Sequence, residues 1–304
     1  MPRQPVYYSE RFSIKDLELF SGIKAHTIRA WERRHGLLKP SRSKTNIRSY
    51  DMDDLKTILN TSLLLKEGMS ISEIAALTGK QREEKIKNEI SRQLDKDSAL
   101  NALKLATVTY DEDLFERTSR NYRVDHGFEA LVENLFLPLL NMLGLLWQAS
   151  AICPAQEHFS SNLVRQKLIS AIDALPYGSD DTRPMAVLYL PENEIHELGL
   201  LYLQYHLRRE GRRSIYLGES VPIEDLGGLA ARWTGPLDIC SVLTIYPRTG
   251  DEMTYLNRLV EYLPEPRIRF HFCGPVLRSI PETSLPDRVH VYSDIPALLK
   301  AILH

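Results

Sequence analysis

The stretch Glu192-Asn-Glu-Ile-His-Glu-Leu-Gly199 decides how the carboxyl-terminal part of this chain is interpreted. It follows an apolar run, Met185-Ala-Val-Leu-Tyr-Leu190, and precedes a helical pattern, Leu200-Leu-Tyr-Leu-Gln-Tyr-His206. Glu194 and His196 are therefore predicted on a loop between a strand and a helix. If the following segments form a parallel sheet, this loop lies at the carboxyl edge of the first strand, where open α/β sheets bind ligands.

A histidine with a carboxylate two residues before it is a candidate metal ligand. The carboxylate can hydrogen bond one ring nitrogen and so orient the other toward a metal. A loop histidine is more often solvated or hydrogen bonded, however, so Glu194 and His196 alone leave both interpretations open.

The sequence after residue 178 alternates between strand-like and helical patterns. Strands are predicted at 185–190, 213–217, 238–244, 268–272 and 289–292. Helices are predicted at 197–210, 222–233, 251–262 and 295–303. This alternation indicates a doubly wound parallel sheet of Rossmann-like α/β class. Because G-x-G-x-x-G does not follow the first strand, a dinucleotide-binding loop is not expected.

Length and composition indicate a multidomain globular protein. The chain has 304 residues, 43% hydrophobic and 26% charged, which is long for one hydrophobic core. No uninterrupted apolar stretch reaches about 18 residues, so we expect no membrane span and a cytoplasmic location. Cys153, Cys240 and Cys273 are widely spaced without a CxxC pair, which argues against a disulfide scaffold or a structural zinc site.

Charge is divided unevenly along the chain. Residues 1–80 contain 14 Lys and Arg against 9 Asp and Glu, whereas the remainder contains 24 against 31. A basic amino-terminal region on an acidic body suggests that this region meets a polyanion.

Two short helices joined by a tight turn are predicted in this basic region. The first begins after a capping box at Ser13 and ends near Gly22, and the second covers about 25–34. This is a helix-turn-helix pattern, and the basic segment 39–50 that follows is typical of a β wing. Two further helices are predicted behind capping residues, namely Asp51 and Ser70.

This region resembles the MerR family of winged-helix regulators over about residues 12–78. Thr27-Ile-Arg-Ala-Trp-Glu-Arg-Arg-His-Gly-Leu-Leu38 is similar to the recognition helix and following turn of that family. The resemblance implies dimers that bind double-stranded operator DNA with pseudo-palindromic symmetry. The residues expected to contact DNA are His26, Thr27, Arg29, Arg33, Arg42, Lys44, Arg48 and Tyr50.

Other residues of the head have expected structural roles. Lys24 departs from the family, which usually has a Ser or Thr cap there, so a weaker cap is expected. Trp31 is expected to pack against the wing. The residues expected mainly in the core are Ile28, Trp31, Leu37 and Leu38.

Residues 81–178 are predicted to be helical. Helices at about 98–107, 111–119, 127–147 and 155–174 suit a four-helix bundle. Trp147 ends one apolar helix, and Glu157 and His158 begin the next after nine intervening residues. From these residues alone, a core tryptophan and helix-start charges are the simpler interpretation.

The carboxyl-terminal region resembles cobalamin-binding domains. The positions that carry the resemblance are Glu194, His196, Gly199, Ser241, Leu243 and Gly274, with 41 residues between Gly199 and Ser241. The resemblance implies that His196 replaces the cofactor's own base as the lower axial ligand of cobalt, while Glu194 fixes its tautomer. Gly199 and Gly274 would let the nucleotide tail pass close to the backbone, and Ser241 would hydrogen bond the buried base. Glu194 stands where most of the wider family has Asp, and Cys273 replaces the first glycine of a Gly-Gly pair.

The order of winged helix, helical bundle and cobalamin domain resembles light-responsive, cobalamin-dependent repressors of the CarH/LitR type. In that family a Trp and a Glu-His pair, separated by nine intervening residues, cover the upper face of adenosylcobalamin. Trp147, Glu157 and His158 match this spacing. The resemblance implies a non-enzymatic repressor that self-assembles and binds its operator in the dark, and releases DNA when light removes the 5′-deoxyadenosyl group. Gln148 stands where some family members carry a second histidine that binds cobalt in the lit state.

Three domains are therefore predicted, covering 1–80, 81–178 and 179–304. Homodimer and homotetramer both remain open. One alternative is a MerR-type regulator whose carboxyl-terminal half no longer binds cobalamin and serves dimerisation or partner binding. Another is a subunit of a cobalamin-dependent methyltransferase or mutase, which the DNA-binding head and the lack of a substrate barrel disfavour.

Overall fold

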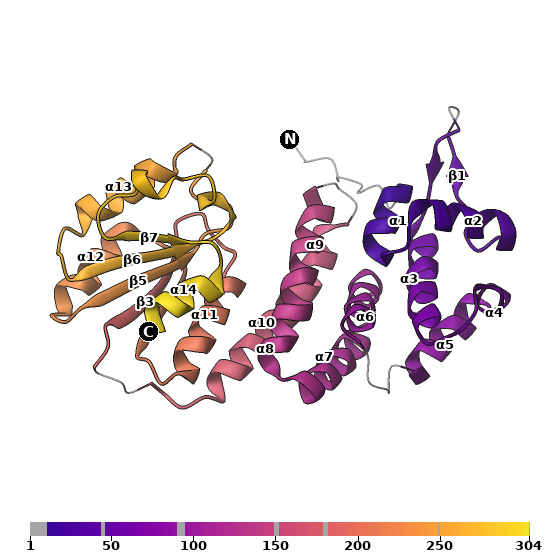
Figure 1. Cartoon of the computed structure of the whole chain (residues 1–304), viewed down its shortest axis with the longest axis horizontal. Coiled ribbons are helices and arrows are strands. Elements are labelled where there is room, and N and C mark those ends of the chain that lie inside the picture. Colours follow the sequence, from indigo (N-terminus) through magenta and orange to yellow (C-terminus); the bar gives the residue numbers. More distant parts are fainter. Residues whose placement is uncertain are drawn as a thin grey trace, which may run out of the picture. The chain divides into compact units, whose positions relative to one another are not determined.

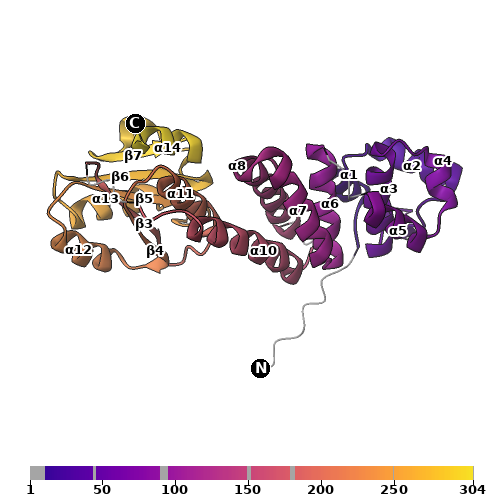
Figure 2. The same ribbon diagram turned by 90° about the horizontal axis from the view of Figure 1, so that it is seen from below.

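The chain forms two compact units, residues 1–162 and 163–304, which are described separately. The division into three domains stays a prediction. This computed structural model describes residues 11–43, 46–89, 95–148, 152–178, 182–248 and 250–303 (Figures 1 and 2).

The amino-terminal head is a winged helix-turn-helix, as predicted. Its elements are α1 Ile14–Ser21, α2 Ala25–His35, β1 Ser41–Arg42, β2 Arg48–Ser49, α3 Met52–Lys66 and α4 Ile71–Ala76. The strands β1 and β2 pair antiparallel to form the wing. The predicted caps at Ser13, Asp51 and Ser70 are confirmed, and each forms a capping box that satisfies backbone groups left open at a helix start.

The recognition helix α2 begins at a position that lacks a local cap. Lys24 makes no side-chain capping bond, as its departure from the family pattern led us to expect. Instead, Glu18 on α1 accepts a hydrogen bond from the backbone N–H of Ala25 at 3.1 Å. The Lys24 ammonium lies 3.2 Å from the same carboxylate. A carboxylate seven residues away therefore supplies the cap and ties α1 to α2.

All four helices predicted for the bundle are present, and one is longer than predicted. The elements are α6 Lys96–Thr109, α7 Glu112–His126, α8 Phe128–Leu131, a π-helical turn Val132–Phe136, α9 Leu137–Gln148 and α10 Pro154–Asp173. Before them, α5 Gly79–Glu89 packs on α3 of the head. The helix predicted at 111–119 continues to His126, where Gly127 ends it with a φ of +88° that other residues rarely adopt.

One helical run, Phe128–Leu146, has the length and composition of a membrane span, which the sequence analysis had not expected. Core helices of globular proteins have the same length and composition. Side chains at Leu131, Leu135, Phe136 and Leu143 are buried within the bundle. We therefore interpret the run as the core helix of the bundle.

A buried polar network joins the head to the bundle within the first unit. The ammonium of Lys104 on α6 donates to the carbonyl of Phe20 on α1 at 2.9 Å and to Asn101 Oδ1 at 3.2 Å. Asn101 donates to Ser62 Oγ on α3, and Ser62 donates to the carbonyl of Ser21. Burial lowers the pKa of Lys104 to about 8. Lys104 thus satisfies a carbonyl at the end of α1 that the helix itself leaves open.

The second unit contains the predicted doubly wound sheet. Its strands are β3 Met185–Pro191, β4 Ser214–Val221, β5 Leu237–Val242, β6 Ile268–Cys273 and β7 Val289–Tyr292. They are all parallel, in the order β4-β3-β5-β6-β7. The first strand, β3, therefore lies between the second and the third, and the point where the strand order reverses is between β3 and β5.

Helices cover both faces of the sheet (Figure 1). They are α11 Leu198–Arg209, α12 Ile223–Arg232, α13 Glu252–Tyr262 and α14 Ile295–Leu303. Side chains of α12 and α13 pack in one hydrophobic cluster with the sheet, and those of α11 and α14 pack in the other. This confirms the predicted fold class.

A buried carboxylate, Asp238, organises charges beneath the α11 and α14 face. It pairs with the fully buried Arg212, with Arg269 at 2.9 Å and with His271 Nε2 at 3.2 Å. Burial by itself would raise the pKa of Asp238, but hydrogen bonds and charge from His271 and Arg212 outweigh it and lower the pKa to about 2. The aspartate is therefore ionised in the folded sheet.

The Asp238 network predicts a large stability loss on Asp238→Ala, because Arg212 would stay buried without its partner. We expect the free energy of unfolding, measured in urea, to fall by about 3–5 kcal/mol. The control Glu224→Ala breaks only the exposed pair with Arg258 and should change it little. Because the folded pKa of about 2 lies below the unfolded value of about 3.9, this stabilisation is present above about pH 4 and is lost as pH falls toward 2. Equal losses in both variants would contradict this role of Asp238.

Candidate functional site

Glu194 joins two loops at the carboxyl edge of the sheet. It lies on the loop between β3 and α11 and is 0% exposed. Its Oε2 accepts three backbone hydrogen bonds from the loop after β5, from Thr244 at 2.9 Å, Ile245 at 2.7 Å and Tyr246 at 3.0 Å. The carboxylate therefore bridges the β3 and β5 loops at the point where open α/β sheets bind ligands.

The other oxygen of Glu194 holds His196. Oε1 lies 2.6 Å from Nδ1 of the ring and accepts the backbone N–H of His196 at 3.1 Å. Burial alone would raise the pKa of Glu194, but hydrogen bonds from His196, Ile245 and Tyr246 outweigh it and lower the pKa to about 2. An ionised carboxylate keeps the proton on Nδ1, so Nε2 is the nitrogen with which this imidazole would bind a metal.

Two exposed isoleucines lie on the two loops that Glu194 joins. The His196 side chain is 45% exposed. Two isoleucines, Ile195 beside it in sequence and Ile245 on the facing loop, are 61% and 55% exposed. Exposed apolar side chains around an oriented imidazole suit a large ligand with apolar surface.

Two glycines of the predicted signature leave no room for a side chain. A Cβ at Gly199 would lie 2.8 Å from Cγ1 of Val242. A Cβ at Gly274 would collide with the backbone of Leu243, and its φ of +135° suits glycine alone. Packing therefore explains both glycines, and their contact with a nucleotide tail stays a prediction.

The remaining signature residues of the sheet are buried. Ser241 donates a hydrogen bond of 2.7 Å to the carbonyl of Tyr189 and so ties β5 to β3. Leu243 and Cys273 belong to the two hydrophobic clusters that flank the sheet. Cys273 thus packs with α11 and α14 as a core residue, and the contact of Ser241 with a cofactor base stays a prediction.

The three residues expected over the upper face of the cofactor belong to the first unit. Trp147 lies at the end of α9, and its side chain is outside the part of the chain that the structure describes. Glu157 and His158 lie in the first turn of α10, with Nδ1 of His158 at 2.8 Å from Glu157 Oε2. The ring of His158 is largely exposed.

These residues fit cobalamin as the group to be held. His196 has a carboxylate behind it, the arrangement that would raise the basicity of its imidazole toward a metal. The exposed Ile195 and Ile245 would provide apolar contact, and the buried position of Cys273 places its thiol in the protein core.

The head presents a basic helix face for DNA. His26, Arg29 and Arg33 on α2 are exposed, and Thr27 is half-buried. The spacing of three and four residues places His26, Arg29 and Arg33 on one side of α2. As expected, Ile28, Leu37 and Leu38 are buried, whereas Trp31 is only partly buried.

The structure corrects the expected role of Tyr50. Its side chain is 0% exposed, so it offers no surface for direct contact with DNA. Its hydroxyl donates to Glu32 Oε2 at 3.3 Å, and burial, followed by the Glu32 charge, raises its pKa to about 12. Arg48 and Arg42 also lie near Glu32, at 3.1 Å and 3.8 Å. Lys44 is outside the described residues.

Glu32 belongs to the expected DNA-binding region, but the sequence pattern did not single it out. It lies on the recognition helix and holds Arg42, Arg48 and Tyr50 of the wing. The sequence pattern could have predicted this role, because a single carboxylate on a basic helix is expected to pair with the positive charges of a neighbouring basic wing. Glu32 therefore positions the wing against the helix.

Two known families match parts of this chain, one over the head and one over the helical bundle. Residues 12–80 match the family described as MerR HTH family regulatory protein, and residues 99–170 match the B12 binding domain. A solved structure, the monomethylamine corrinoid protein of Methanosarcina barkeri, covers 71% of this chain and 98% of its own at 15% identity, with a TM-score of 0.49.

Two curated relatives are similar over most of the chain. The HTH-type transcriptional repressor CarH of Myxococcus xanthus is 32% identical over 80% of this chain and 82% of its own length. The HTH-type transcriptional repressor CarA of the same organism is 32% identical over 71% and 70%. This chain therefore belongs to the same family as CarH and CarA, the MerR-type transcriptional repressors that carry a B12 binding domain.

Proposed function

We propose that this chain is a light-responsive repressor that binds adenosylcobalamin at His196. In this proposal the protein acts in the cytoplasm as a dimer or tetramer, has no enzymatic activity, and binds operator DNA through its head. The observation that carries the proposal is the Glu194–His196 pair, held at the strand-order reversal of the sheet.

The residues of the sheet unit have distinct tasks. Glu194 retains the proton on Nδ1 of His196, so that Nε2 binds cobalt. The nucleotide tail would pass the backbone near Gly199 and Gly274, which packing also requires to be glycine. The free nitrogen of the cofactor base is an acceptor, so the Ser241 hydroxyl would donate its proton to that nitrogen in place of the carbonyl of Tyr189.

In this proposal Trp147, Glu157 and His158 would contact the bound cofactor from the first unit. Bound adenosylcobalamin supplies a cobalt–carbon bond that light breaks, with loss of the 5′-deoxyadenosyl group. An assembly in which Trp147 packs on that group is favoured only while the group is present, which makes it a ligand-biased equilibrium between two states. The Lys104 network then provides a physical connection from the bundle to α1 and α3 of the head.

Cofactor retention in the dark tests the proposal directly. The purified protein is mixed with adenosylcobalamin in the dark and desalted, and absorption spectra are recorded before and after illumination. We expect a retained red colour that changes in light, and its loss in His196→Ala. Glu194→Gln should weaken binding by about 10–100-fold, because the imidazole loses the ionised partner that orients it. The control Glu192→Gln, an exposed carboxylate on the same loop, should bind normally.

Gel filtration and DNA binding of the same samples complete the test. We expect larger assemblies that bind DNA in the dark. In light we expect smaller assemblies that release DNA. Cobalamin that washes through would contradict the proposal and favour a carboxyl-terminal half that serves only dimerisation or partner binding. Retained cobalamin without any effect of light on assembly would overturn light sensing alone.

The DNA face yields a separate prediction. Arg29→Ala and Arg33→Ala should each weaken binding to a random-sequence duplex and reduce the slope of log Kd against log salt by about 1, because each loses one phosphate contact. Tyr50→Phe should change affinity by less than about two-fold, since the lost hydroxyl bonds Glu32 inside the protein.

Fluorescence anisotropy over a range of salt concentrations measures both quantities. Arg258→Ala in the sheet unit, which removes an exposed positive charge far along the chain from the head, serves as the charge-matched control. A loss in Tyr50→Phe as large as that in Arg33→Ala would mean that the hydroxyl contacts DNA after all.

A further inference from the structure

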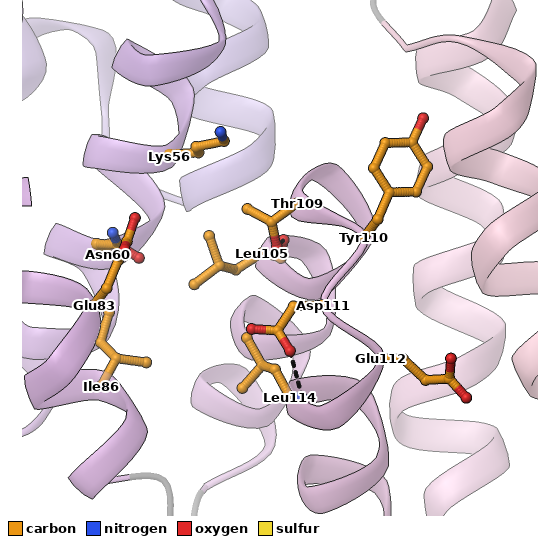
Figure 3. Close-up of a pocket in the computed structure, with 10 residues that line it drawn as sticks. All are labelled: Lys56, Asn60, Glu83, Ile86, Leu105, Thr109, Tyr110, Asp111, Glu112 and Leu114. Atoms are coloured by element: carbon orange, nitrogen blue, oxygen red, sulfur yellow. Dashed lines mark hydrogen bonds between the residues drawn. The ribbon is translucent and has the colours of Figure 1, made fainter. Parts of the chain in front are cut away.

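A cavity of about 450 Å³ lies where the head meets the bundle, within the first unit. It is lined on the head side by residues of α3 and α5, and on the bundle side by α6, α7 and the turn between them. Figure 3 shows Asn60 and Glu83 on the head side, and Thr109, Asp111 and Glu112 on the bundle side. Its volume is in the range of sites that bind small molecules.

Asn60 makes this cavity more than a gap between helices. The side chain lines the cavity, is 3% exposed, and its Oδ1 has no hydrogen-bond partner among the described residues. A buried carboxamide oxygen without a partner is costly, so native proteins normally satisfy it. A ligand that donates a hydrogen bond in the cavity would satisfy it.

The other lining groups define the chemistry of that donor. The lining includes three carboxylates, those of Glu83, Asp111 and Glu112, and one ammonium, that of Lys56. Asp111 also accepts the backbone N–H of Leu114 at 2.9 Å, and the side chain of Glu112 points away from Lys56 (Figure 3). Lys56 already has a carboxylate within 3.7 Å, that of Asp53. The excess of acceptors and negative charge favours a cation that carries N–H groups.

The apolar part of the lining defines the body of the ligand. Ile86 on α5, Leu105 on α6 and Leu114 on α7 are buried and line the same cavity. Removing an apolar body from water against these side chains is favourable, whereas a bare inorganic cation would gain nothing from them. We propose that this cavity binds a small organic amine with an apolar body, as an effector site separate from the His196 edge.

Such a ligand would act on the head. It would contact α3 and α5 of the winged-helix region together with α6 and α7 of the bundle, and so stabilise their present arrangement. Any change in that arrangement on DNA binding would then respond to the amine, because a ligand shifts an equilibrium by its differential affinity for the two states. This input does not depend on cobalamin.

Isothermal titration of the full-length protein with three probes of similar size tests the proposal. The probes are 2-phenylethylamine, 2-phenylethanol and phenylacetate, which differ mainly in charge. We expect the amine to bind about ten-fold more tightly than the alcohol, and phenylacetate to bind most weakly. Equal binding of the three, or no binding of the amine at about 10 mM, would overturn the proposal.

Variants distinguish this cavity from nonspecific association. Asn60→Leu should weaken amine binding by about ten-fold without lowering the free energy of unfolding of the unliganded protein, because it removes an unsatisfied buried oxygen. Glu83→Gln should weaken binding by about two- to five-fold. The matched control Glu84→Gln changes the next carboxylate along α5, which does not line the cavity, and should bind normally. Unchanged binding in both Asn60→Leu and Glu83→Gln would overturn the site.

Discussion

The ionised carboxylate of Glu194 is the interaction on which the geometry of the sheet edge depends. Buried without partners, such a charge would cost several kcal/mol, so its burial requires donors on all sides. Three consecutive backbone N–H groups of the β5 loop and the imidazole of His196 provide them. The dependence is mutual, because these three amides would be left unsatisfied without the carboxylate. One side chain thus determines the path of the β5 loop and the orientation of the histidine together.

Much of this architecture could be predicted from the sequence because it depends on residues that are close together along the chain. The caps at Ser13, Asp51 and Ser70 depend on residues three positions apart, and the strands on short apolar runs. What could not be predicted depends on contacts between distant positions. The cap that Glu18 supplies and the wing contacts of Glu32 follow only from how helices and strands pack. The three amides bound by Glu194 lie about fifty residues further along the chain.

The corrected role of Tyr50 illustrates a general difficulty in interpreting a basic wing. A tyrosine among arginines has the composition of a DNA contact, yet burial of its ring and an internal acceptor decide otherwise. Glu32 explains why the cluster holds together, since it gathers two guanidinium groups and a hydroxyl that would otherwise repel or stay unpaired. In the head, therefore, Glu32 holds the basic residues of the wing beside the recognition helix.

The Lys104 network has a consequence for the exchange of domains between regulators. The last turn of α1 in the head is completed by an ammonium that belongs to α6 of the bundle, and Ser62 of α3 is shared with Asn101 of the same helix. The winged helix thus depends on α6 of the bundle for some of the hydrogen bonds of its own helices. A chimaera that grafts this head onto another sensor would leave carbonyl groups of α1 exposed or unsatisfied, unless α6 is transferred with it. Recombination points in such regulators would accordingly be tolerated after α6 rather than between α5 and α6.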